Sequence, residues 1–305
     1  MSQRFWRLID NLMRSKLFVP GSRPELFSKA LTGGADGLSF DLEDSVREDR
    51  KAEARANLAS FLIGHTVAKS SKTIVVRVNP LDTPHFVDDL AAVVCANVHL
   101  INLPKAEHPD QIRMAARQLA ELERDKGLNV NGRTPIGLLV NIETPRSLRI
   151  AHDLAAADPR VHGLQLGLGD LFEPYGIDRR QVIAVQQAMF LVAMAAHEVG
   201  IRAYDGAFAN VANIESFKTE AELAKSFGFH GKSCIHPSQV GTANAVFQPS
   251  AEEIAYSQRV ILAEAQALEK SVGAFLVDGK MIDKPFVDRA KHILSIAQQQ
   301  GMVDK

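Results

Sequence analysis

Runs of apolar residues alternate along this chain with segments whose apolar positions recur at the spacing of a helix. Two of these runs, at residues 135–143 and 161–170, are apolar at nearly every position and end on an acidic residue, Glu143 and Asp170. A strand that is apolar on both faces is buried on both faces, which is typical of a parallel sheet covered by helices. The two runs and the helical segment between them therefore predict one strand–helix–strand unit.

The same alternation extends over most of the chain and predicts eight strands. We expect them at residues 16–20, 37–43, 73–79, 98–105, 135–143, 161–170, 201–206 and 231–237. Eight short strands that alternate with helices at this chain length favour an α/β fold of the (β/α)8 TIM-barrel type over an open doubly wound sheet. The first strand is also not followed by the Gly-x-Gly-x-x-Gly motif of a dinucleotide-binding sheet.

A further segment follows the predicted barrel. Residues 252–268 have a helical pattern, residues 274–283 predict a β-hairpin that turns at Asp278-Gly279, and a last helix comes after them. We therefore expect a barrel domain at residues 1–248 and a C-terminal extension at residues 249–305. The extension would serve as packing, as a lid or as an arm for oligomerisation.

Composition narrows the class of function. The chain has 305 residues, of which 46% are hydrophobic, and this is enough for a large barrel core. The net charge of −1 indicates neither nucleic acid nor an anionic membrane as a partner. Cys95 and Cys234 form no disulfide or metal-binding pattern. Since the chain also lacks a signal-peptide pattern and a run of membrane-spanning length, we expect a cytoplasmic protein.

The strand ends supply the candidate site, because the active site of such a barrel lies at the C-terminal ends of its strands. The residues expected there are Glu43, Asp44, Arg77, Lys105, Glu143, Asp170, Asp205 and His236. Neighbouring parallel strands end side by side, so the carboxylates of Glu143 and Asp170 should lie close together. Two such carboxylates suit Mg²⁺, which leaves positions open for substrate oxygens. Alternatively, each acid caps the helix that follows it.

The basic residues of this set each have two interpretations. Arg77 suits a substrate carboxylate or an enolate oxygen, or it forms a structural ion pair with Glu43 or Asp44. Lys105 could form a Schiff base, or it is a solvated lysine of a polar loop. His236 faces the site or bonds a neighbouring loop. The set contains no Ser-His-Asp or Cys-His arrangement and no histidine cluster that would favour zinc.

Several motifs follow one another along the chain. They are Leu17-Phe-Val-Pro-Gly-Ser-Arg-Pro24, Phe40-Asp-Leu-Glu-Asp-Ser45, Arg77-Val-Asn-Pro-Leu-Asp-Thr-Pro84, Leu103-Pro-Lys105, Ile142-Glu-Thr144, Leu166-Gly-Leu-Gly-Asp-Leu171, Gly231-Lys-Ser-Cys-Ile-His-Pro237 and Met281-Ile-Asp-Lys-Pro285. With these motifs the chain resembles the citrate lyase beta-chain / malyl-CoA lyase family, in its CoA-ester lyase branch, from about Arg14 to Ile296. The resemblance implies a Mg²⁺-dependent carbon–carbon lyase of acyl-CoA thioesters on a (β/α)8 barrel, usually a homotrimer.

The resemblance also implies roles for single residues. It implies metal binding by Glu143 and Asp170 and substrate binding by Arg77. We expect Glu43 and Asp44 to hold metal-bound water or to orient the arginine.

Further implied positions concern CoA and the acid–base chemistry. The CoA-contacting positions of the malyl-CoA lyase branch match Phe18, Arg23, Lys29, Ile235 and His236. The catalytic aspartate of that branch, which lies on a C-terminal lid from the neighbouring subunit, matches Asp283. Two departures from the family pattern, Leu168-Gly169 before the metal aspartate and Pro145 after Ile-Glu-Thr, border the acid pocket.

We therefore expect cleavage of a malyl-CoA or citramalyl-CoA type thioester to acetyl-CoA and a 2-oxo acid, with glyoxylate, pyruvate and oxaloacetate open as the acid. The alternatives are a malyl-CoA-type thioesterase, a citrate lyase beta chain acting on a citryl thioester of a carrier protein, a CoA-independent pyruvate aldolase, and a CoA-binding protein on an inactive barrel. The segment with Asp283 counts against the carrier-dependent chain. We expect no nucleic acid or membrane partner, and a homo-oligomer that is a trimer or a dimer of trimers.

Overall fold

A computed structural model describes residues 13–128, 134–269 and 272–303. The chain divides into two compact units, residues 1–245 and 246–305. In the described ranges no helix has both the length and the apolar character needed to cross a membrane.

The first unit is built on eight strands. They are β1 (Ser15–Pro20), β2 (Gly37–Asp41), β3 (Thr73–Arg77), β4 (Leu100–Leu103), β5 (Gly137–Ile142), β6 (Val161–Leu166), β7 (Arg202–Tyr204) and β8 (Lys232–Cys234). Every neighbouring pair is parallel, in the order β7-β6-β5-β4-β3-β2-β1-β8. Between β7 and β8 the ring is closed by Asp205, whose N–H donates to Gly231 at 2.8 Å and whose carbonyl accepts from Ser233 at 2.9 Å. The predicted (β/α)8 barrel is confirmed.

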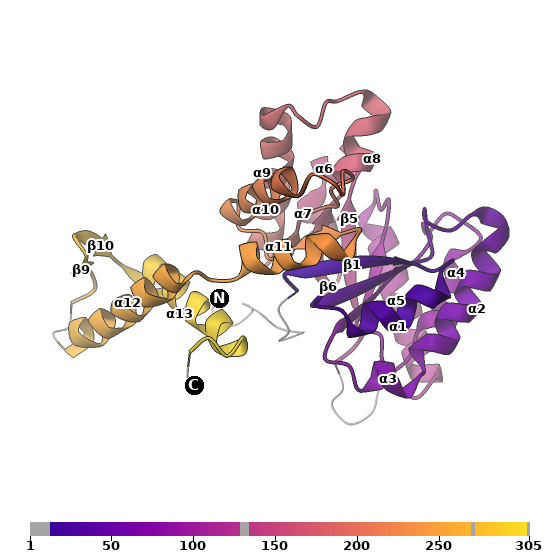
Figure 1. Ribbon diagram of the computed structural model, residues 1–305, viewed down its shortest axis with the longest axis horizontal. Helices are drawn as coiled ribbons and strands as arrows, with labels where there is room; N and C mark the ends of the chain where they lie inside the picture. Colours follow the sequence, from indigo (N-terminus) through magenta and orange to yellow (C-terminus); the bar gives the residue numbers. More distant parts are fainter. Residues whose placement is uncertain (1–12, 129–133, 270–271, 304–305) are drawn as a thin grey trace. The chain divides into compact units, whose positions relative to one another are not determined.

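Helices lie outside the strands (Figure 1). They are α1 (Phe27–Thr32), α2 (Lys51–Leu62), α3 (His65–Ala68), α4 (Phe86–Val93), α5 (Pro109–Asp125), α6 (Pro145–Arg149), α7 (Ala151–Ala155), α8 (Leu168–Phe172), α9 (Val182–Glu198), α10 (Ile214–Ser226) and α11 (Pro237–Phe247), with short 3-10 turns η1 (Pro24–Leu26), η2 (Glu48–Arg50) and η3 (Glu173–Tyr175). The helix predicted between the fifth and sixth strands is broken at Ile150, which separates α6 from α7.

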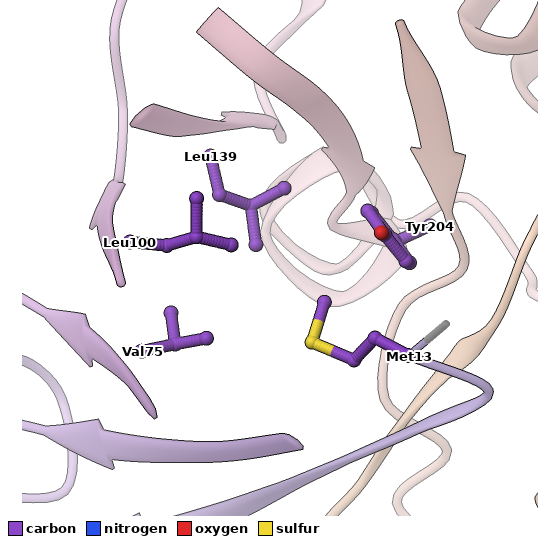
Figure 2. Packing of buried hydrophobic residues seen from close by; sticks show 5 residues of the cluster. All are labelled: Met13, Val75, Leu100, Leu139 and Tyr204. Atoms are coloured by element: carbon purple, nitrogen blue, oxygen red, sulfur yellow. The ribbon is translucent and has the colours of Figure 1, made fainter. Parts of the chain in front are cut away.

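The interior of the barrel changes from apolar to polar along the strands. One buried apolar cluster fills the barrel interior on the side away from the C-terminal strand ends. Figure 2 shows its side chains converging inside the ring of strands; they are Met13, Val75, Leu100, Leu139 and Tyr204. Residues two positions apart on a strand share a face, so the next inward positions after Val75, Leu100 and Leu139 are Arg77, Asn102 and Asn141. The polar and charged side chains of the interior therefore lie next to this apolar cluster, toward the C-terminal ends of the strands.

The second unit contains α12 (Ala251–Glu269), the antiparallel strands β9 (Phe275–Val277) and β10 (Lys280–Ile282), and α13 (Lys284–Gln299). The hairpin turns at Asp278 and Gly279, which both have positive φ, 51° and 77°, as a type I′ turn requires. Its core contains Val260, Val277, Ile282, Val287 and Ala290. The predicted helix–hairpin–helix order is confirmed.

Candidate active site

Glu143 follows β5 and is buried, and each of its carboxylate oxygens accepts a hydrogen bond. Its Oε1 accepts a hydrogen bond from the main-chain N–H of Lys105 at 2.8 Å, and its Oε2 accepts one from Asn141 Nδ2 at 3.0 Å. The amide of Asn102 in turn donates to Asn141 Oδ1 at 2.6 Å. Such supporting hydrogen bonds orient a metal-binding or reacting carboxylate. The sequence interpretation missed Asn102 and Asn141, although their spacing of two from Leu100 and Leu139 was a usable signal.

The start of α6 fixes the main chain of Glu143. Ser147 Oγ accepts from the N–H of Glu143 at 3.1 Å, and Thr144 Oγ1 accepts from the N–H of Ser147 at 3.1 Å. Pro145 occupies the first helical position, where its missing N–H has no intrahelical partner to lose. The departure from the family pattern at Pro145 therefore fits the local structure.

Glycine is required beside Glu143 at Gly167, which directly follows the next strand, β6. A Cβ added at Gly167 would lie 2.5 Å from Glu143 Cβ and 2.8 Å from its Oε2, whereas a Cβ at Gly169 would meet nothing within 4 Å. Gly167 thus lets the main chain of β6 pass close to the carboxylate. Gly169 leaves open space next to Asp170.

Asp170 lies in the first turn of α8 and is exposed. Among the residues that the structure describes, no hydrogen bond or ion pair holds its carboxylate. Burial raises the pKa of Glu143, and the negative charges of Glu43 and Asp170 raise it further, to about 7. The charge of Asp170 therefore acts on Glu143, and the two acids follow adjacent strands, β5 and β6.

Arg77 ends β3 and is clamped by a carboxylate on the neighbouring strand. Its Nε donates to Asp41 Oδ1 at 2.7 Å and its Nη2 donates to Asp41 Oδ2 at 2.8 Å. Asp41 pairs with Arg77 in the β2–β3 register and also accepts from the N–H groups of Glu43 and Ser45. Two opposite charges that end consecutive parallel strands were a signal for this pair, which the sequence interpretation missed.

Glu43 lies between the two cations of the site. Its Oε2 is 2.9 Å from Arg77 Nη1 and its Oε1 is 2.9 Å from Lys105 Nζ. Neither oxygen has an aligned hydrogen-bond donor, so charge attraction holds these contacts. Asp44 is more exposed, with Oδ1 3.4 Å from Lys105 Nζ and Oδ2 3.6 Å from Arg77 Nη1. The ion pair of Arg77 that the sequence left open is thus present, with Asp41 as its main partner.

Phe18 faces two cations. The Lys16 ammonium lies 4.4 Å and the Arg77 guanidinium carbon 5.0 Å from the centre of its ring. Lys16 is fully buried and donates to Gln165 Oε1, which also accepts from Ser233 Oγ at 3.4 Å. Burial and the charge of Arg77 lower the pKa of Lys16 well below its usual range.

The other CoA-contacting candidates follow the neighbouring strands β1 and β8. Arg23 follows β1 and Lys29 lies on α1, and both are exposed; Arg23 Nε pairs with Glu25 Oε1 at 2.8 Å. Ile235 is 40% exposed after β8, and His236 Nδ1 lies 2.8 Å from Ser238 Oγ. Because β1 and β8 are paired and parallel, these segments begin at the same end of the barrel.

Asp205 has a different place from the one its position at a strand end suggests. It is fully buried and its carboxylate contacts Lys232 Nζ at 2.5 Å, and Lys232 Nζ contacts Glu220 of α10 at 2.6 Å. Arg179 completes this cluster through Glu220 at 2.6 Å. The cluster links β7 and β8 to α10, so Asp205 has a structural role in the wall of the barrel.

Asp283 lies in the second unit, between β10 and α13. It occupies the position before the first residue of α13, but its side chain makes no capping hydrogen bond. Its Oδ1 is buried without a hydrogen-bond partner. A buried carboxylate oxygen without a donor is costly.

Glu143 and Asp170 suit a divalent cation, because their carboxylate oxygens can act as metal ligands. Each oxygen of Glu143 has one hydrogen bond and keeps a free lone pair, and burial, helped by the negative charges of Glu43 and Asp170, raises the pKa of Glu143. Mg²⁺ is typically held by one or two carboxylates, with water and substrate at its other positions. The described part of the chain contains no group of three or more His, Cys, Asp or Glu side chains arranged to hold a metal.

Carboxylates, an arginine and a lysine gather at the C-terminal ends of the barrel strands, which is where the active site of a (β/α)8-barrel enzyme lies, and they form the candidate active site. Residues 14–237 match the HpcH/HpaI aldolase/citrate lyase family. The chain belongs to this family, and it is an enzyme of the carbon–carbon lyase type. The family expected from the sequence motifs is confirmed.

Curated relatives and solved structures give the same family. The chain is 35% identical to the citrate lyase subunit beta of Haemophilus influenzae, over 94% of this chain and 97% of the relative. It is 30% identical to an L-malyl-CoA/beta-methylmalyl-CoA lyase of Cereibacter sphaeroides, over 93% and 94%. The protein CitE from Mycobacterium tuberculosis, solved in complex with magnesium, acetoacetate and coenzyme A, has a TM-score of 0.73 and 30% identity over 95% of this chain and 99% of that one.

Proposed function

We propose that the protein is a Mg²⁺-dependent lyase that cleaves a malyl-CoA or citramalyl-CoA type thioester into acetyl-CoA and a 2-oxo acid. The observation that carries this proposal is the carboxylate pair Glu143 and Asp170 beside the clamped guanidinium of Arg77. The relatives named as lyases of malyl-CoA, and the CitE structure with magnesium and coenzyme A, support it.

The reaction breaks the bond between the hydroxyl-bearing carbon and the methylene next to the thioester. Glu143 and Asp170 would hold a divalent cation, which would supply Lewis-acid polarisation of the substrate oxygens. Arg77, held in place by Asp41, stabilises the negative thioester oxygen as the methylene carbon becomes an enolate. The hydroxyl loses its proton to solvent as its carbon becomes the carbonyl of the 2-oxo acid. Asp283 donates a proton to the enolate carbon, which yields acetyl-CoA, and regains a proton from solvent. Glu43 and Lys105 keep the arginine and the acid cluster in a fixed arrangement.

Binding of CoA involves the exposed ends of β1 and β8. Arg23 and Lys29 are exposed cations that suit CoA phosphates, and Ile235 and His236 offer apolar and polar contacts on the adjacent segment. Phe18 joins this surface to the guanidinium of Arg77.

We propose that Asp283 acts in the barrel of a neighbouring subunit of a homotrimer or a dimer of trimers. An exposed apolar face supports an oligomer: on α9, Ile183, Phe190, Leu191 and Met194 are 50–72% exposed, and the helix has no charged residue before Glu198. A helix that is apolar all round is normally covered on all sides.

Two other activities have specific support. The chain is 33% identical to a (3S)-malyl-CoA thioesterase of Cereibacter sphaeroides. The citrate lyase beta subunit of Haemophilus influenzae aligns with 94% of this chain. That alignment includes most of the extension, so the presence of the segment around Asp283 does not separate the carrier-dependent activity from the CoA-dependent one.

A cleavage assay distinguishes these activities. The full-length protein with Mg²⁺ is given malyl-CoA, citramalyl-CoA or citryl-CoA, and both 2-oxo acid and free thiol are followed. A 2-oxo acid without free thiol is the expected result, and the preferred ester identifies the acid. Free thiol without a 2-oxo acid assigns a thioesterase. Turnover of citryl thioester only on an added carrier protein assigns a citrate lyase beta chain, and the Glu143→Gln variant controls for background hydrolysis.

A further inference from the structure

We propose that Lys105 is a positioning residue that acts on the metal site in two ways. Its main-chain N–H orients the Glu143 carboxylate. Its ammonium is a fixed positive charge that weakens cation binding until an anionic substrate is present. This inference rests on the proposed metal site. It adds a role for a residue that touches neither the reacting atoms nor, in its side chain, either metal ligand.

The main chain of Lys105 has an unusual conformation. Within the described ranges only two residues other than glycine have positive φ, Lys105 at 52° and Asp278 at 51°. Asp278 lies in a hairpin turn that demands this conformation, whereas Lys105 follows Pro104 at the end of β4. The left-handed conformation disfavours any residue with a Cβ. At Lys105 it directs the N–H to Glu143 Oε1 at 2.8 Å.

The side chain explains why this position is not glycine. Glycine would adopt the same φ without strain and would still offer the N–H. The ammonium of Lys105, however, lies 2.9 Å from Glu43 Oε1 and 3.4 Å from Asp44 Oδ1, and it also senses the charge of Asp170. Burial disfavours this charge, but Glu43, Asp44 and Asp170 together outweigh burial and raise the pKa of Lys105 above its ordinary value. The side chain is therefore a cation, which also disfavours a Schiff base.

The charges of the site show what this cation does. Arg77 is engaged by Asp41, so Lys105 is the second cation facing Glu43, Asp44 and Asp170. Without a metal, it offsets the repulsion among these carboxylates. A divalent cation on Glu143 and Asp170 is repelled by the same ammonium. A substrate that brings a carboxylate restores the balance, so cation and substrate should strengthen each other's binding.

The test uses variants that separate the charge from the main chain. Lys105→Met removes the charge and keeps the side-chain length, Lys105→Arg keeps the charge, and Lys105→Gly keeps only the N–H. Calorimetric titration with Mn²⁺ and Mg²⁺, in the presence and absence of oxaloacetate, measures cation affinity and its coupling to the acid without any turnover.

Lys105→Met and Lys105→Gly should bind Mn²⁺ about tenfold more tightly than the parent protein in the absence of the acid, with the coupling to oxaloacetate reduced by a similar factor. Lys105→Arg should stay within about twofold. Equal or weaker Mn²⁺ binding by Lys105→Met, with normal binding by the parent, overturns the counter-cation role and leaves the proposed function intact. Absence of Mn²⁺ binding in the parent and all variants removes the proposed metal site together with this inference.

Thermal unfolding tests the main-chain role. Lys105→Ala must keep the strained φ to aim the N–H, so it should melt about 2 °C below Lys105→Gly, the reverse of the usual order for these two residues. Equal melting temperatures for the two variants would show that the left-handed conformation is not required, and would overturn this part of the inference.

Discussion

The guanidinium of Arg77 is held by the carboxylate of Asp41 through two hydrogen bonds, at 2.7 and 2.8 Å, and the two residues face each other across the β2–β3 register. Both side chains are largely buried, with 13% and 3% exposed. A planar two-point contact of this kind fixes the orientation of the guanidinium as well as its position. The direction in which Arg77 presents its free N–H groups is therefore set by Asp41.

Replacing Asp41 should change the orientation of the Arg77 guanidinium while leaving its charge in place. Asp41→Asn keeps the shape but breaks the charged pair, so kcat should fall about 100-fold through misalignment of the arginine. Unfolding free energy should fall by about 3 kcal/mol. Steady-state kinetics and urea unfolding measure the two effects.

A matched control lies at the opposite end of β2, next to the start of β1. Asp36 forms a comparable ion pair with Arg14, with Nε–Oδ2 at 2.8 Å. Asp36→Asn should lower stability without changing kcat per folded molecule. An equal loss of kcat in both variants would assign the effect of Asp41 to general destabilisation.

Two glycines beside the acid pocket should respond differently to the same substitution. Gly167→Ala places a Cβ against Glu143 and should displace its carboxylate, so Mn²⁺ affinity should fall 10- to 100-fold, roughly the effect of losing a supporting contact. Gly169→Ala adds the same methyl group in open space and should bind Mn²⁺ within about twofold of the parent protein. Similar affinities for the two variants would contradict the close approach of Gly167 to Glu143.

Cation binding should depend on pH through Glu143. Burial, helped by Glu43 and Asp170, raises the pKa of this carboxyl to about 7, so protons compete with the metal below that pH. Mn²⁺ affinity should fall about tenfold for each pH unit below about 7. Calorimetry from about one unit below to about one unit above this pKa checks the slope, and a flat profile would rule out Glu143 as the titrating ligand.

The same titration affects the stability of the metal-free protein. The folded-state pKa of Glu143 is raised from 4.5 to about 7, so the folded state keeps a proton that the unfolded state has lost. The stabilisation from this group is fully present below pH 4.5 and is lost as the pH rises through about 7. Glu143→Gln should remove this part of the pH dependence while leaving the remaining slope unchanged.

Asp283 should be needed for turnover and not for binding. Asp283→Asn should retain Mn²⁺ and CoA binding and lose most of kcat, because the enolate carbon has no positioned acid. If Asp283 serves a neighbouring barrel, mixing Asp283→Asn with Arg77→Met during refolding should restore activity, since mixed oligomers contain some intact sites. Full activity in Asp283→Asn alone would remove this residue from the mechanism.

The order of elements follows directly from the apolar runs, and the meeting of Glu143 and Asp170 follows from parallel pairing. Strand ends were harder to place. The second strand was predicted to reach Glu43, whereas β2 ends at Asp41. Leu42 still donates its N–H to the Arg77 carbonyl at 2.9 Å, and both Leu42 and Glu43 stay buried, so the burial pattern continues past the last residue of the strand.

The side of the barrel wall that a residue of a short strand faces could not be predicted in the same way. β7 has three residues, which is too short for an alternating pattern to determine which side Asp205 faces. The left-handed conformation of Lys105 was equally hidden, because local sequence gives no reason for a lysine to adopt it. Contacts between distant segments, such as the N–H of Lys105 with Glu143, decide such cases.

The closure of the ring at Asp205 gives the barrel a seam. Most adjacent strands share a ladder of several residues, but β7 and β8 meet through one bridge, which the Lys232–Glu220 contact secures from outside. Local opening of a fold begins where the fewest cooperative bonds must break. Solvent exchange of the Asp205 and Ser233 amide protons therefore reports how often the cylinder opens into a curled sheet, independently of the chemistry at its mouth.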